Sequence, residues 1–169
     1  MSEKLFKSRN FLEKMAGWFP GYKGYKEKEL RRETDKILRD RIAQRIDSIR
    51  KHVTRLTARL SENGALEYMN EMGRVIKLLE GIRDRIKFAT YGYAGFFALH
   101  TIKEDELDRI YSFDMEIVNL IEKLESVIDN VDMERLEAFI KSLEKVIDDI
   151  EERWAEREIL IKGGSDGIN

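Results

Sequence analysis

The apolar residues of this chain recur at helical spacing over almost its whole length, and no other feature constrains the fold as strongly. Between residues 38 and 60 the repeat steps by three or four positions through Leu38, Ile42, Ile46, Ile49, Val53, Leu56 and Leu60. Residues spaced in this way form one narrow stripe along a helix, as in a coiled coil. No segment alternates apolar and polar residues as a half-buried strand does, and Pro20 is the only proline. The sequence therefore predicts an all-α fold.

Five helices are predicted, at about 3–19, 26–62, 65–88 and 103–129 and from about 132 onward. Asn63-Gly64 suits a left-handed cap at the end of the second helix, and the spacing of Thr101 and Glu104 suits a capping box at the start of the fourth. The last four helices are long enough for an antiparallel four-helix bundle that contains a coiled-coil-like hairpin. We expect a short amphipathic arm with a glycine-tyrosine linker at 1–24, the helical bundle at 25–162 and a flexible tail at 163–169.

Several function classes lack the residues that they require. The chain has no cysteine, which excludes disulfides, thiolate metal sites and cysteine nucleophiles. Neither His52 nor His100 has a glutamate three residues before it, as helical di-iron sites require. There is no glycine-rich phosphate loop, no signal peptide and no run of roughly 20 apolar residues. We therefore predict no enzymatic activity, cofactor, metal or small-molecule substrate, and a cytoplasmic location.

Charge is abundant and unevenly distributed. Lysine and arginine number 31 against 33 aspartates and glutamates, with basic residues in excess before residue 60 and acidic residues in excess after residue 100. Such charge with few amides is frequent in heat-adapted proteins. The basic tract after Pro20 could follow a nucleic-acid backbone, or its interleaved acids could form ion pairs within the helix. The second interpretation is favoured; the tract comprises Lys23, Lys26, Lys28, Arg31, Arg32, Lys36, Arg39, Arg41, Arg45, Arg50, Lys51, Arg55 and Arg59.

One carboxylate lies where an apolar side chain is expected. Asp114 falls in the middle of the apolar face that Ile110, Val118 and Ile121 define. A buried carboxylate must be paired, or its pKa must rise. We expect an ion pair with an arginine of the second or third helix. The alternative is a perturbed acid in a ligand-binding or enzymatic pocket, formed with Tyr91, Tyr93, Phe96 and Phe97.

The first helix is the strongest candidate for an interaction surface. It combines an apolar face with basic residues, as helices that lie at membrane interfaces do, although most amphipathic helices only cover a protein core. We expect a non-enzymatic adaptor or scaffold that self-associates and docks this arm on a helical partner or on the inner face of an anionic membrane. The residues proposed for docking are Leu5, Phe11, Leu12, Met15, Trp18 and Phe19, with Lys7 and Lys14.

The linker and the start of the second helix carry one recognisable pattern. The run PGYKGYKEKELRRETDK, from Pro20 to Lys36, resembles the amino-terminal signature of a family of small uncharacterised prokaryotic helical proteins. It covers about a tenth of the chain. The resemblance implies a helical fold, and because no activity is attached to that family, it implies no role for any residue.

Overall fold

The computed structural model describes residues 2–25, 27–89 and 103–163, and helices make up most of these ranges. Five α-helices are present in them: α1 (Ser2–Trp18), α2 (Arg31–Glu62), α3 (Met69–Lys87), α5 (Glu104–Asp129) and α6 (Leu136–Gly163). Two short 3-10 helices, η1 (Lys28–Leu30) and η2 (Leu66–Tyr68), precede α2 and α3. The described ranges contain no strand, so the predicted all-α class is confirmed for this part of the chain.

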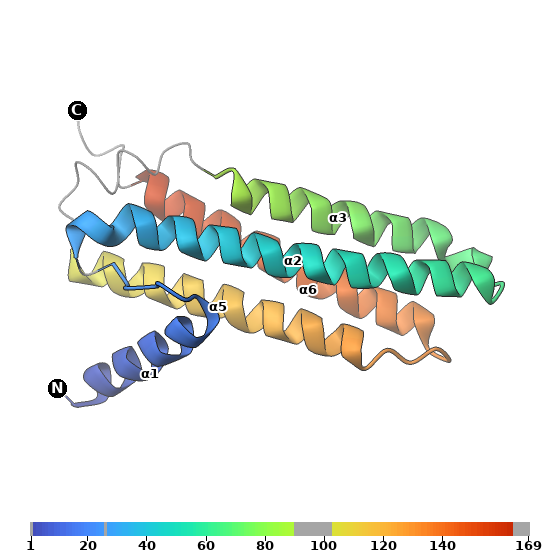
Figure 1. Cartoon of the computed structure of the whole chain (residues 1–169), viewed down its shortest axis with the longest axis horizontal. Helices are drawn as coiled ribbons and strands as arrows, with labels where there is room; N and C mark the ends of the chain where they lie inside the picture. Colours follow the sequence, from blue (N-terminus) through green and yellow to red (C-terminus); the bar gives the residue numbers. More distant parts are fainter. Residues whose placement is uncertain (1, 26, 90–102, 164–169) are drawn as a thin grey trace.

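The helices α2, α3, α5 and α6 lie side by side and form the body of the molecule (Figure 1). The pairs α2–α3 and α5–α6 are in closest contact, and α3–α6 and α2–α5 close the ring. This arrangement is compatible with an antiparallel four-helix bundle. The helix α1 lies outside the ring and approaches α5 obliquely with its carboxyl-terminal end (Figure 1). No described helix has the length and apolarity needed to cross a membrane.

The stripe predicted on α2 is buried along its whole length. All seven of its apolar residues lie in the core, opposite the apolar faces of α3, α5 and α6. Gly64 lies in the turn that follows α2 and adopts the left-handed region at φ 79°, as Asn63-Gly64 predicted. The N–H of Ala65 donates to the Leu60 carbonyl at 2.9 Å. Only glycine adopts this conformation without steric cost. The α2–α3 hairpin therefore follows directly from the sequence.

The predicted helix starts differ from the observed ones by one residue at α5, by four at α3 and α6 and by five at α2. The helix α5 begins at Glu104, and its first turn is closed by the Lys103 N–H, which donates to Glu106 Oε2 at 2.9 Å. The expected capping pair of Thr101 and Glu104 would place this start two residues earlier; Thr101 lies outside the described residues. The helix α6 begins at Leu136 because Asp132 Oδ1 accepts from the Glu134 N–H at 2.9 Å and holds a turn there.

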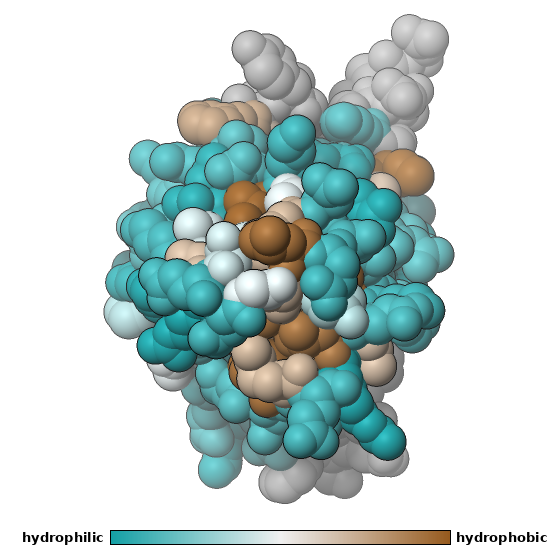
Figure 2. Space-filling view, turned by 90° about the vertical axis from the view of Figure 1, so that its right-hand side faces the viewer, coloured by the Kyte–Doolittle hydropathy of each residue, from teal (hydrophilic) through white to brown (hydrophobic). Residues whose placement is uncertain are grey.

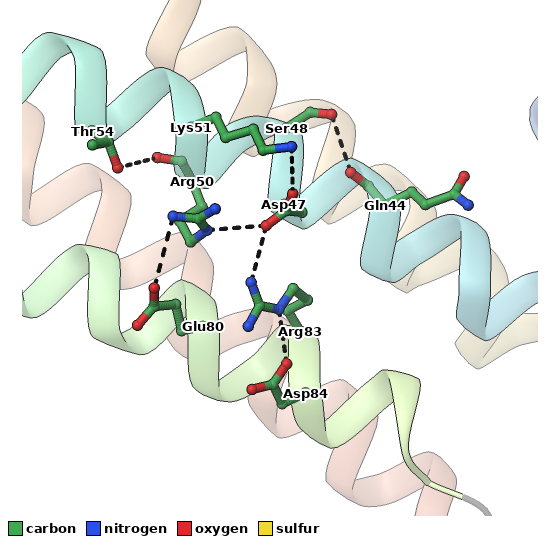
Figure 3. A network of polar contacts seen from close by, with 9 residues as sticks. All are labelled: Gln44, Asp47, Ser48, Arg50, Lys51, Thr54, Glu80, Arg83 and Asp84. Atoms are coloured by element: carbon green, nitrogen blue, oxygen red, sulfur yellow. Dashed lines mark hydrogen bonds and ion pairs between the residues drawn. The ribbon is translucent and has the colours of Figure 1, made fainter.

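Charged side chains join α2 to α3 along the outside of the hairpin (Figure 3). Asp47 accepts from Arg50 Nε at 3.0 Å and from Arg83 Nη1 on α3 at 3.0 Å. Lys51 Nζ lies 2.9 Å from its other oxygen. Arg50 reaches across to Glu80 at 3.7 Å. These contacts hold the pKa of Asp47 well below its usual range, chiefly through the bond from Lys51.

Replacing Asp47 by asparagine is expected to destabilise the protein by about 1 kcal/mol at neutral pH, because the group is partly solvated. A carboxylate with a depressed pKa stabilises the fold above its ordinary pKa of about 4, and this contribution is lost as the pH falls below that value. The deficit of Asp47→Asn should therefore shrink on acidification. Urea unfolding of both proteins at pH 7 and pH 3 measures the difference, and an equal deficit at both pH values would contradict this role.

Candidate functional site: a buried polar network beneath the amino-terminal arm

The first nine residues of α2 bury four polar side chains, whereas the side chains that the helix buries after Arg39 are apolar. Arg31, Thr34, Asp35 and Arg39 are each at most 7% exposed. Asp35 and Arg39 precede Ile42 by seven and three positions, so they continue the buried stripe of α2 toward its amino end. Buried charge is unfavourable unless it is paired and hydrogen-bonded. This end of the body must therefore contain a complete polar network.

Arg157 of α6 is the centre of that network. Its side chain is fully buried. Its Nε donates to Asp114 Oδ1 at 2.6 Å, and its Nη2 donates to Asp35 Oδ1 at 2.9 Å and to the Tyr25 hydroxyl at 3.0 Å. Arg39 Nε donates to the second oxygen of Asp35 at 2.8 Å. Two guanidinium groups thus balance two carboxylates, drawn from α2, α5 and α6.

Asp114 shares its carboxylate between two buried donors. Its Oδ2 accepts from the Tyr25 hydroxyl at 2.8 Å, while Oδ1 accepts from Arg157. Burial raises the pKa of Asp114, and the charge and hydrogen bond of Arg157 oppose that rise. Burial and the nearby Asp114 charge also raise the pKa of Tyr25. The Tyr25 phenol therefore keeps its proton at neutral pH and donates a hydrogen bond to the Asp114 carboxylate.

The glycine-tyrosine linker is fixed to the body by its backbone. The Tyr25 N–H donates to the Tyr111 hydroxyl at 2.6 Å, and the Tyr25 carbonyl accepts from Arg31 Nε at 2.7 Å. The Gly24 carbonyl accepts from the Thr34 hydroxyl at 3.0 Å. Gly24 has φ 78°, and a Cβ there would lie 2.8 Å from the Tyr111 hydroxyl oxygen. Both the conformation and the space require glycine.

Aromatic rings join the linker to α1 and α5. Tyr25 lies with its ring centroid 5.4 Å from that of Tyr111, and Phe11 of α1 packs on the other side of Tyr111 at 5.0 Å. Tyr22 contacts Phe11, Phe19 and Tyr25 at 6.0–6.3 Å. Aromatic pairs at these separations stabilise by about 0.5–1.5 kcal/mol beyond the area that they bury. The polar network is therefore covered by an apolar layer that the linker and the arm supply.

The last two turns of α1 occupy a seat on α5 and α2. Trp18 Nε1 donates to Glu122 Oε1 at 2.9 Å, and Lys14 Nζ donates to Glu122 Oε2 at 2.9 Å and to Asn119 at 2.8 Å. The Arg45 guanidinium of α2 lies 3.7 Å above the Trp18 ring. Beneath these polar contacts Met15 and Phe19 are fully buried. We call Glu122, Asn119 and Arg45 the arm seat.

These positions correct the expectation that the apolar face of the arm is free to dock elsewhere. Met15 and Phe19 belong to the core, and Phe11, Leu12 and Trp18 pack against it. Lys14 is engaged by Glu122. Leu5 and Lys7 lie outside the residues whose side chains are described. In this structure the arm packs on the body of its own chain.

The structure also corrects the partner expected for Asp114. Its arginine comes from α6, and α2 supplies a second carboxylate, Asp35. The reason is that α5 packs directly against α6, so its apolar face meets Arg157. Asp114 lines neither of two surface hollows found among the described residues, of about 480 and 240 Å³. The other predicted pocket residues, Tyr91, Tyr93, Phe96 and Phe97, lie outside the described residues.

Several basic residues of this tract are buried or form ion pairs within the chain. Arg31 and Arg39 are buried, Arg45 pairs with Glu125 at 3.0 Å, and Arg50 and Lys51 belong to the Asp47 network. These contacts agree with the interpretation that the acids and bases of the chain pair internally.

Sequence reasoning missed Arg157 and Asp35, although a signal for each was present. Arg157 follows Ile150 and Trp154 by seven and three positions and precedes Ile161 by four, so it lies on the buried face of α6. Asp35 lies three positions before Leu38 on the buried face of α2. A search for charged residues on every apolar stripe would have found both as buried charges that need partners.

Comparison of the chain with protein-family models, curated proteins and solved structures finds no match. The function is therefore inferred from the site alone.

Proposed function

We propose that this protein is a non-enzymatic scaffold, built as an antiparallel four-helix bundle, which self-associates by exchanging its amino-terminal arm with a second copy. The observation that supports this is the way in which the arm is held. The helix α1 lies outside the ring of four helices and is held by the arm seat. It is followed by Phe19, Pro20 and Gly21, and Gly21 has φ 90°.

The contacts of the arm are the same whichever copy supplies it. An arm that leaves its own seat exposes Met15 and Phe19 and uncovers the core residues that they pack against, and the arm of a second copy restores both contacts. Exchange of identical elements produces a closed, two-fold dimer with no new surface chemistry. Short hinge segments favour exchange, because they limit how well the arm can relax in the closed form.

The hinge lies before the buried network. Tyr25 is bonded to Asp114 and Arg157 in the core of its own body, and the linker backbone is held by Tyr111, Arg31 and Thr34. Residues after Tyr22 therefore stay with their own body while residues 2–19 move. The network acts as the anchor that fixes where the exchanged segment begins.

A zero-length cross-link tests this proposal. Lys14 Nζ and Glu122 Oε2 lie 2.9 Å apart, so a carbodiimide should join them as an amide. Unlabelled and ¹⁵N-labelled protein are mixed, incubated, cross-linked and digested. Exchange predicts Lys14–Glu122 peptide pairs with one light and one heavy member. The pair Lys141–Glu137, at 2.7 Å within α6, must stay unmixed and serves as the control. Unmixed Lys14–Glu122 pairs at all protein concentrations would contradict arm exchange.

A further inference from the structure

An apolar patch covers the end of the body that carries the α2–α3 and α5–α6 turns. Figure 2 views this end and shows apolar side chains gathered at its centre within a polar border. Leu66 of η2 is 63% exposed, and Met133 of the α5–α6 turn is 46% exposed. Ala65, Tyr68 and Val131 are half-buried beside them. We call Leu66, Met133 and these three residues the end patch.

A hollow of about 480 Å³ lies at the border of the end patch. Tyr68 forms one wall, and residues 134–138, among them Glu134 and Arg135, form another together with Lys141. The hollow is large enough to take one or two bulky apolar side chains, since ligand pockets in proteins start at about 300 Å³. An exposed apolar patch with a polar rim is typical of a protein interaction site.

The rim of the end patch is acidic. The segment 59–72 contains one arginine and three glutamates, and the segment 127–141 contains four acidic and two basic residues. Glu71 Oε2 is buried and has no hydrogen-bond partner among the described residues. A second copy placed end to end would meet this rim with the same charge. Nucleic acids and anionic lipid surfaces would be repelled as well.

We propose that the end patch binds a basic amphipathic helix of a partner protein. Apolar residues three and four positions apart on such a helix would cover Leu66 and Met133 and enter the hollow beside Tyr68, as in other helix-in-groove complexes. Lysines or arginines that flank this face would meet Glu67, Glu71 and Glu134. The end patch contains none of the residues of the arm seat, and this inference does not depend on arm exchange.

A labelled 18-residue peptide of leucine and lysine in amphipathic order is the probe, with its leucine-glutamate counterpart as the negative peptide. Fluorescence anisotropy at 150 mM salt should show binding of the basic peptide only. The double variant Leu66→Glu/Met133→Glu should bind it at least tenfold more weakly. Because this variant gains negative charge, weaker binding must come from the lost apolar surface and cannot come from electrostatics.

Phe88→Glu/Ile159→Glu is the matched control. These residues are 62% and 70% exposed outside the end patch, so the control adds the same charges to an equally solvated apolar surface. It should bind like the native chain, and circular dichroism should show equal helix content in all three proteins. Undiminished binding by Leu66→Glu/Met133→Glu, equal losses in both double variants, or equal binding of the acidic peptide would each overturn the proposal. Light scattering that shows end-patch-dependent dimers of the native chain without peptide binding would assign the patch to a second copy instead, and would overturn it too.

Discussion

Replacing Arg157 by methionine is expected to destabilise the protein by about 3–5 kcal/mol, the loss that follows when one partner of a buried ion pair is removed. The change leaves Asp114 with the Tyr25 hydroxyl as its remaining donor in the network described above, in a site with no exposure to solvent. Asp35 is affected less, because Arg39 still donates to it at 2.8 Å. Urea unfolding monitored by circular dichroism measures the loss.

Two further variants test whether the loss of stability in Arg157→Met comes from the unpaired Asp114 carboxylate. Arg85→Met removes an arginine that lies 2.6 Å from Glu158 but is 44% exposed, so it should cost less than about 1 kcal/mol. Arg157→Met/Asp114→Leu removes the stranded carboxylate together with its partner and should recover more than half of the loss. A single-variant loss as small as that of Arg85→Met would show that the network is not the anchor inferred here.

The loss in Arg157→Met should also depend on pH. Burial already raises the pKa of Asp114, and removing the guanidinium raises it further. A carboxyl group whose folded pKa lies above its unfolded value of about 4 destabilises the fold progressively as the pH rises from that value through the folded pKa. The deficit of the variant should therefore be smaller at pH 4 than at pH 8.

The second large effect is expected at Gly24. Alanine there must adopt φ near 78°, which costs about 1–2 kcal/mol. Its Cβ also meets the Tyr111 hydroxyl oxygen at 2.8 Å and Leu12 at 3.3 Å. Tyr111 must then move away from the Tyr25 N–H, and this loses a further hydrogen bond of about 1 kcal/mol. We expect Gly24→Ala to destabilise the protein by about 3 kcal/mol.

Gly64→Ala separates backbone strain from crowding. Gly64 has nearly the same φ, 79°, but a Cβ there has nothing within 4 Å, so only the strain should appear. Gly24→Ala should also loosen the arm, because Leu12 and Tyr111 lie between α1 and the body. Limited trypsin digestion should cut at Arg9 or Lys14 sooner in Gly24→Ala than in Gly64→Ala. Equal losses of stability and equal digestion would contradict a close fit of the linker.

Regular helical elements were predictable because their information is local. The stripe on α2 and the turn at Asn63-Gly64 follow from spacing and from one conformational preference, and both are confirmed. The anomaly at Asp114 was visible for the same reason. Its position on an apolar face identified a carboxylate that needs a partner, and the structure buries it completely.

The composition of the network was not predictable in the same way. Tyr25, Asp35, Asp114 and Arg157 are separated by up to 132 positions, and their meeting depends on which helices are neighbours. The contacts of the arm seat were not predictable from the sequence for the same reason. Amphipathicity showed that α1 must cover something, but the pairing of Lys14 and Trp18 with Glu122 needs the register of α1 against α5, which no local pattern encodes.

Arm exchange is tested most directly by charge reversal on the two sides of the arm seat. Lys14→Glu and Glu122→Lys each place like charges where the native chain has an ion pair at 2.9 Å, so each variant alone should hold its arm poorly. In an exchanged heterodimer of the two variants, each arm meets the opposite charge. Mixing the variants should therefore yield a dimer of about twice the 19.9 kDa chain mass by light scattering, in one-to-one ratio. A mixture in which both variants keep the masses that they show alone would contradict arm exchange.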